Sequence, residues 1–287
     1  MHEGQTMENH PEASEKDCCG PTCCGGSNPG AASRITDRND VKASVREHYG
    51  KIAQEASSCC GPNCGCGSET DEQVLSVLMS DEYTNVDEQI VATANLGLGC
   101  GTPTAFASLR PGMRVLDLGS GAGIDVFIAA KSVAPTGKAI GLDMTDEMLK
   151  RARANKAKLG ITNAEFWKGD IEDMPVESSS IDRIISNCVI NLVPDKRKAF
   201  SEMYRVLRPG GKFTVSDVVS LGEIPDDVRR NTELWAGCIA GALDKEEYLR
   251  TVRDAGFRDL TISAEKPYTL EGDTSFSLES ITLTATK

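Results

Sequence analysis

From residue 114 onward, short apolar runs alternate along the chain with segments that repeat apolar residues every three to four positions. Short apolar runs favour buried strands, and the longer period favours helices that cover a sheet. The alternation therefore predicts strand–helix–strand units and one mostly parallel sheet of seven strands, with helices on both faces. The expected strands are residues 114–118, 138–142, 164–168, 181–189, 212–219, about 259–264 and 277–285.

Helical patterns fill the intervals between these strands and also precede them. The first 40 residues are polar and rich in glycine, and their apolar residues show neither a helical nor a strand period. This segment is expected to be disordered. The expected helices are 41–56, 73–79, 86–96, 124–131, 146–159, 195–207 and 244–255. The chain is thus divided into a Cys-containing tail (1–40), a helical segment with a Cys-rich motif (41–110), a core (111–221) and a C-terminal insertion with closing strands (222–287).

The first strand ends in a glycine-rich turn with the sequence DLGSGAG, residues 117–123. Glycines let a ligand approach the backbone, and the free N–H groups of the next helix face the same spot, so a nucleotide-like cofactor is expected there. The dinucleotide pattern GxGxxG is broken by Ile124, which disfavours NAD. Asp143, twenty residues past Gly123, is placed to accept hydrogen bonds from both ribose hydroxyls. The alternative is a glycine-rich turn without a ligand.

Length and charge limit the classes of function. The 287 residues allow one large domain, alone or with appendages. The net charge of −12 disfavours a nucleic-acid partner, which normally requires a basic face, and favours a small-molecule substrate. No apolar run is long enough to cross a bilayer, and the N-terminus has no signal pattern, so no membrane partner and a cytoplasmic location are expected.

The cysteines are unusually many and unevenly placed: eight of the 11 precede residue 70. The sequence CCGPTC at 18–23 recurs as CCGPNC at 59–64. In a chain without a secretion signal, this usage favours thiol chemistry or soft-metal binding over a disulfide framework. As a hypothesis, the first repeat captures soft metal ions and passes them to the catalytic site; the alternative is a dispensable thiol-rich tail.

Four thiols are expected to approach the cofactor. Cys188 follows the fourth strand, and Cys238 lies in the insertion after the fifth. Cys100 precedes the core on a loop at a helix end that is expected to be flexible, and Cys60 lies on the N-terminal approach. Ligands of such sheets bind at the carboxyl ends of the strands, and small neighbouring residues are expected to leave the sulfur atoms of Cys188 and Cys238 accessible. The alternative is that they are small buried hydrophobes.

The acceptor is expected to need no histidine base, because the three histidines lie outside the core. Trivalent arsenic meets this condition, since thiolates bind this soft centre and its lone pair can attack a methyl group.

The glycine-rich turn and LRPGG at 207–211 resemble the Rossmann-like class I methyltransferases that use S-adenosylmethionine (SAM). Over roughly 41–287 the resemblance narrows to the arsenite methyltransferase family. It is carried by YGKIAQ near Tyr49, SSCC at 57–60, LGLGCGTP at 96–103, GLDMTDEML at 141–149, SNCVINLVPDK at 186–196 and CIAGAL at 238–243.

This resemblance implies an enzyme that methylates arsenite from SAM, in metalloid detoxification. It implies Cys188 and Cys238 as arsenic ligands, Cys60 as the third ligand, and a redox role for Cys60 and Cys100 with thioredoxin or glutathione restoring the thiols. Cys60 is chosen over Cys59 from the SSCC ending. The implied cofactor-binding residues are Asp117, Gly119 and Gly121 at the methionine part, Asp143 at the ribose, Asp170, Ile171 and Glu172 near the adenine, and also Met144 and Asn187.

Two alternatives stay open at this point. A carbon or oxygen methyltransferase of a quinone or sterol would share the glycine-rich turn and LRPGG, but it gives no reason for Cys188 and Cys238 at the substrate rim. A Cys-rich soft-metal-binding protein could instead use Cys59, Cys60, Cys64 and Cys66 as a zinc site on an inert scaffold.

Overall fold

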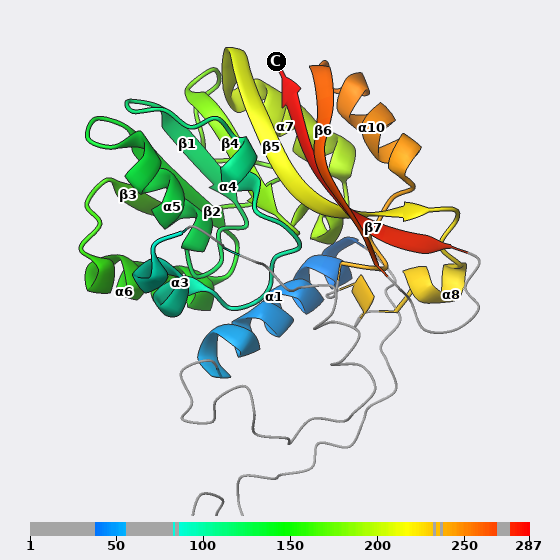
Figure 1. The fold of residues 1–287 in the computed structure, drawn as a ribbon. Helices are drawn as coiled ribbons and strands as arrows, with labels where there is room; N and C mark the ends of the chain where they lie inside the picture. Colours follow the sequence, from blue (N-terminus) through cyan, green and yellow to red (C-terminus); the bar gives the residue numbers. More distant parts are fainter. Residues whose placement is uncertain (1–37, 56–82, 84–85, 232–233, 236–237, 269–275) are drawn as a thin grey trace, which may run out of the picture. The chain divides into compact units, whose positions relative to one another are not determined.

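The structure is a computed structural model that describes residues 38–55, 83, 86–231, 234–235, 238–268 and 276–287. All of these belong to one compact unit, residues 32–287 (Figure 1). The expected helix at 73–79, most of the tail at 1–40 and eight of the 11 cysteines lie outside the described residues.

Seven strands form one sheet in the order β3-β2-β1-β4-β5-β7-β6. The first five pair in parallel, and β7 runs antiparallel to both of its neighbours. The prediction of a seven-stranded, mostly parallel sheet closed by a C-terminal hairpin is confirmed. The strands are β1 (Arg114–Leu118), β2 (Lys138–Asp143), β3 (Ala164–Lys168), β4 (Ile181–Asn187), β5 (Leu207–Leu221), β6 (Arg258–Tyr268) and β7 (Ser277–Thr286).

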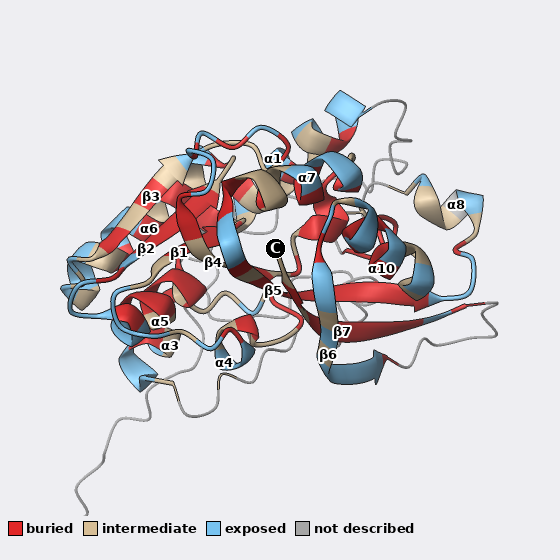
Figure 2. Ribbon diagram, turned by 90° about the horizontal axis from the view of Figure 1, so that it is seen from above, coloured by how far each residue is buried: buried red, intermediate tan, exposed pale blue. Residues whose placement is uncertain are grey.

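Helices cover both faces of the sheet, because successive residues of each central strand point to opposite sides (Figure 2). In β1, Val115 belongs to a buried cluster with residues of α3 (Glu88–Ala94), α5 (Ile124–Val133) and α6 (Asp146–Leu159), whereas Leu116 belongs to another with residues of α7 (Lys196–Val206) and α10 (Lys245–Asp254). The expected cover on both faces is confirmed.

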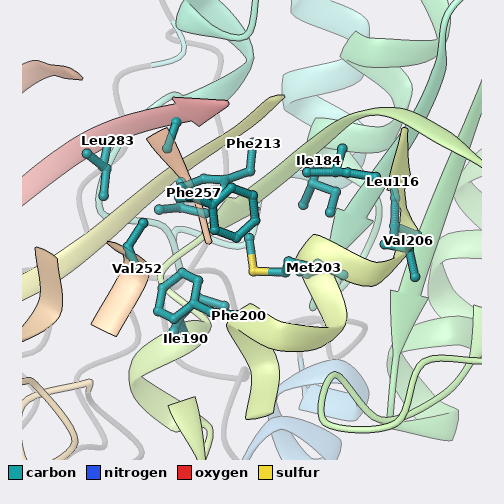
Figure 3. Close-up of a cluster of buried hydrophobic side chains, with 14 of the residues drawn as sticks. Leu116, Ile184, Ile190, Phe200, Met203, Val206, Phe213, Val252, Phe257 and Leu283 are labelled. Carbon is teal, nitrogen blue, oxygen red and sulfur yellow. The ribbon is translucent and has the colours of Figure 1, made fainter. Parts of the chain in front are cut away.

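The largest buried hydrophobic cluster lies between the sheet and the helices α7 and α10. Figure 3 shows Phe200 and Met203 of α7 directed at Phe213 of β5. The Phe213 and Phe257 rings meet edge to face, with centroids 4.7 Å apart. Each fully buried side chain of this size contributes about 1.5–3 kcal/mol to folding, so this core fixes the sheet that presents the site.

The LRPGG segment differs from expectation. Instead of forming only a turn before the strand, it opens β5: Leu207 pairs with Ile181, and pairing resumes between Lys212 and Arg183 after an irregularity. Leu207 is fully buried and joins the core, whereas Gly210 takes a φ of 75°, which accommodates the extra residues. Three short helices, too short to give a period, were also not predicted: α4 (Pro103–Phe106), η1 (Ile190–Leu192) and α8 (Asp226–Arg229).

Helix α1 (Arg38–Glu55) lies against the carboxyl ends of the strands. Its residues Val41 and Val45 are buried, and the ammonium group of Lys42 contacts the carboxylates of Asp170 and Glu172 at 2.6 Å each. Among the helices of the described residues, none is long and apolar enough to span a bilayer.

Candidate functional site

A pocket runs along the carboxyl ends of β1 to β4, with α1 on its other side. From α1 it is lined by Lys42, Val45 and Tyr49. Eight of the nine predicted cofactor residues line this one pocket: Asp117, Gly119, Gly121, Asp143, Met144, Asp170, Ile171 and Asn187. The glycine-rich turn and the acid after the second strand therefore meet, as their places in a parallel sheet require.

The glycine-rich turn is held by the end of β2. Gly119 and Gly121 have φ values of 64° and 50°, in the left-handed region that favours glycine. The N–H of Gly121 donates to Asp143 Oδ2 at 2.9 Å, and the N–H of Thr145 donates to Asp143 Oδ1 at 2.8 Å. Asp143 also lines the pocket, which brings its carboxylate to the place where the hydroxyls of a ribose would bind.

The carboxylate of Asp117 differs from that of Asp143 in its hydrogen bonding. It is 4% exposed and lines the pocket, and among the described residues no hydrogen bond to its carboxylate is found. Its pKa is raised well above the usual range because of burial and the neighbouring carboxylates of Asp125 and Asp143. A positively charged group in the pocket would relieve this repulsion. The residues thus fit SAM, which carries an ammonium group and a ribose diol.

Two predicted cofactor residues have other contacts. Glu172 is absent from the pocket lining; its carboxylate binds Lys42 of α1 and the N–H of Asp195 at 2.8 Å. Asn187 lines the pocket, yet its amide also fixes the neighbouring loop, accepting from the N–H of Cys100 at 3.0 Å and donating to Gly101 O at 2.6 Å.

Asp125, in the first turn of α5, is a pocket residue that the sequence patterns did not single out. It is 4% exposed and accepts a hydrogen bond from the Tyr83 hydroxyl at 3.0 Å. Burial raises its pKa to about 6. The available signal was an acid among the apolar residues of the helix that directly follows the glycine-rich turn.

Three of the four predicted thiols, those of Cys100, Cys188 and Cys238, lie in one buried cluster beside the pocket. The Cys238 thiol donates to the carbonyl of Cys188 at 3.0 Å, and Cys188 itself lines the pocket. The pKa of Cys188 is raised well above its usual range by hydrogen bonds to the thiols of Cys100 and Cys238 and by burial. Cys60 lies outside the described residues.

Two expectations about these thiols were wrong. Cys188 and Cys238 are 2% and 0% exposed, so their sulfur atoms are not accessible from solvent. Cys100 does not sit on a free loop, because Asn187 holds its N–H and the Ser280 hydroxyl donates to its carbonyl at 2.6 Å. Within the described part of the chain, no group of three or more His, Cys, Asp or Glu side chains is arranged to hold a metal ion.

Both Cys188 and Cys238 have left-handed backbone, with φ values of 57° and 64°. This conformation costs residues that carry a Cβ about 1–2 kcal/mol. It is maintained by hydrogen bonds from their N–H groups to Ser216 O at 2.7 Å and Trp235 O at 2.9 Å. Strain of this kind concentrates at functional sites.

A second buried polar group, also not predicted, adjoins Cys238. It contains the oppositely charged Lys196 of α7 and Asp217 of β5, which are near enough to attract each other. The Tyr248 hydroxyl donates to Asp217 at 3.2 Å. Burial raises the pKa of Asp217 to about 7 and lowers the pKa of Lys196 to about 8.

Comparison with known proteins identifies the family. Residues 109–256 match the family model described as "Methyltransferase domain". The chain is 42% identical over 234 residues to the arsenite methyltransferase of Halobacterium salinarum and 33% identical over 236 residues to that of Mus musculus; each match covers 79% of this chain. The chain spans about three fifths of the length of these relatives, 60% of each.

A solved structure gives the same result. The crystal structure of an arsenic(III) S-adenosylmethionine methyltransferase from Chlamydomonas reinhardtii is 35% identical, with a TM-score of 0.62, and the match covers 75% of this chain and 73% of that one. The expected class I methyltransferase fold is therefore confirmed. The chain belongs to the arsenite methyltransferases within the methyltransferase family.

Proposed function

We propose that this protein transfers methyl groups from SAM to trivalent arsenic bound by its cysteines. One observation carries the proposal: Cys188 lines the same pocket as Asp117 and Asp143, and Cys238 is hydrogen-bonded to Cys188. Thiols beside a pocket that fits SAM give a soft acceptor a binding site next to the methyl donor. The relatives' names support the same acceptor.

The proposed chemistry needs no histidine base. When arsenous acid binds, each thiol proton leaves with a hydroxyl of arsenic as water, and one As–S bond forms. Burial and the neighbouring thiols raise the pKa of Cys188, so its neutral thiol is the starting state of this overall exchange. SAM, when bound, supplies an electrophilic methyl group. The arsenic lone pair forms the new As–C bond, and the sulfur of SAM keeps the electron pair of the broken S–C bond.

The lining of the pocket supports the following proposed roles in cofactor binding. Asp117 is assigned to the ammonium group, Asp143 to the ribose hydroxyls, and Asp170 with Ile171 to the adenine. Tyr49 of α1 stands between the two halves of the site: burial, the thiols of Cys238 and Cys188 and the carboxylate of Asp143 all raise its pKa.

The third arsenic ligand and the redox cycle belong to the proposal by resemblance alone. Cys60 would supply the third thiol, and Cys60 with Cys100 would form a disulfide when pentavalent methylated arsenic is reduced. Thioredoxin or glutathione would then restore the thiols. Metalloid detoxification is the proposed cellular role.

The test is methyl transfer from SAM to arsenite with excess thiol, with products identified by mass spectrometry. Cys188→Ser and Cys238→Ser are each expected to abolish methylated arsenic while calorimetry shows unchanged SAM affinity. Asp143→Ala should weaken SAM binding about tenfold, since charge-assisted hydrogen bonds are lost. Asp226→Ala, at an exposed carboxylate, is the matched control.

Full activity in either cysteine variant would contradict the ligand assignment. If SAM binds and no methylated arsenic appears, the acceptor must be sought among carbon and oxygen nucleophiles, such as quinones. A stoichiometric zinc ion that survives Cys188→Ser would favour the metal-binding alternative.

A further inference from the structure

Cys238 is placed by contacts to other segments, because its own segment belongs to no strand of the sheet. Its thiol contacts the Cys188 carbonyl, and its own carbonyl accepts a hydrogen bond from Asn191 Nδ2 at 3.3 Å. The distance between the two thiols therefore depends on residues that lie between Cys188 and α7.

Asn191 joins three segments. It lies in η1, three residues after Cys188, and is completely buried. Its Nδ2 also donates to Val218 O of β5 at 2.6 Å. Both donations go to carbonyl oxygens, which only the NH₂ end of the amide can serve. A Cβ at position 241 would collide with the Asn191 carbonyl, so glycine alone lets the Cys238 segment approach η1 this closely.

Lys196 holds the end of η1 from the side of α7. Its Nζ donates to the carbonyls of Asn191 at 3.2 Å and Val193 at 3.0 Å, which lie at the end of η1. The ammonium group also lies 5.7 Å from the ring centre of Trp235, whose Nε1 donates to Leu192 O at 3.4 Å. Lys196 is only 8% exposed, so this charge is desolvated at a cost that its contacts must offset.

On the basis of the proposed arsenic methylation, we propose that Asn191 and Lys196 are positioning residues for the metalloid: they fix the Cys238 segment against the Cys188 segment so that both thiols reach one arsenic atom. Neither residue is among those that line the cofactor pocket. Their loss should therefore affect arsenite more than SAM.

The experiment compares Lys196→Met with Lys198→Met in the full chain. Lys198 is exposed on the same helix. Arsenite binding without SAM, SAM binding without arsenite, and thermal unfolding are measured for each, with KM for arsenite and kcat. Lys196→Met is expected to weaken arsenite binding and raise its KM about tenfold or more, as for lost charge-assisted hydrogen bonds, and to leave SAM affinity unchanged. Lys198→Met should match the wild type throughout.

Folded Lys196→Met with wild-type arsenite affinity, or with equal losses for arsenite and SAM, would overturn the inference. If Lys196→Met does not fold, Asn191→Ala decides, because it removes the donations from Asn191 Nδ2 to Val218 O and Cys238 O. Unchanged arsenite affinity in folded Asn191→Ala overturns the inference. A wild-type protein that binds no arsenite would instead refute the proposed function.

Discussion

At the scale of single residues, the cofactor pocket gathers three carboxylates in a place of little solvent. Asp117 and Asp125 are each 4% exposed, and Asp143 lies beside them. Burial raises the pKa of all three. Such carboxylates destabilise the free fold when ionised, and a cationic ligand offsets that cost. Without a ligand, the ionised carboxylates of the pocket therefore lower the free energy of unfolding.

Asp125 gives this cost a measurable pH dependence. Its pKa rises from 3.8 to about 6 on folding, so between these values the native state binds the proton more tightly than the unfolded state. Its contribution to the free energy of unfolding therefore falls as pH rises through this window and stays low above it. Asp125→Asn keeps an acceptor for Tyr83 and removes the charge.

The advantage of Asp125→Asn over the wild type in urea unfolding should thus grow between about pH 4 and pH 6 and then level off. Asp226→Asn, at an exposed carboxylate, is the control and should follow the wild type. A pH-independent difference for Asp125→Asn would contradict the shifted pKa.

At the scale of elements, α1 closes one side of the cofactor pocket, and Lys42 attaches it to the loop after β3. The ammonium group bridges Asp170 and Glu172, and the Glu172 side chain is only 10% exposed. This arrangement explains why Glu172, expected at the adenine, lies outside the pocket lining: its carboxylate holds the helix that covers the pocket.

Lys42→Met is expected to weaken SAM binding about two- to fivefold, because partly exposed ion pairs contribute roughly 0.5–1 kcal/mol. Amide hydrogen exchange in α1 should become faster in the same variant. Lys51→Met is the matched control on the same helix, since Lys51 is exposed and forms an ion pair with the exposed Glu47. Equal SAM affinities and equal exchange in the two variants would contradict the role given to Lys42.

At the scale of the whole molecule, three of the 11 cysteines lie among the described residues, in the buried cluster beside the pocket, and the other eight lie outside them. The repeated CCGPxC sequence is the feature that the core does not explain. The hypothesis is that its first copy captures soft metal ions. It predicts an effect on the delivery of arsenite to the site and no effect on the methyl transfer itself.

Changing Cys18, Cys19, Cys23 and Cys24 together to Ser should lower the methylation rate at low arsenite, because captured metalloid raises the local concentration at the site. The rate at saturating arsenite should not change. Rates measured over a range of arsenite concentrations test this, and an unchanged rate at the lowest concentrations would show that the first repeat is dispensable.

The sequence by itself determined the order of the elements and most of their bounds. The expected helix at 146–159 and strand at 114–118 agree with α6 and β1. Apolar periods, glycines and helix ends are local features, and they act within a few residues. The glycine-rich turn and Asp143 were found for the same reason, because the carboxyl ends of adjacent parallel strands share one edge.

Only the tertiary structure decided the surroundings of the functional side chains. Three contacts illustrate this: Cys238 with Cys188, Asn187 with Cys100, and Lys42 with Glu172. Each joins residues that are 50 to 130 positions apart in the sequence. Long-range contacts of this kind leave no period in the sequence. Burial, charge and hydrogen bonding at the site follow from how the elements pack, and packing is a property of the assembled sheet and its helices.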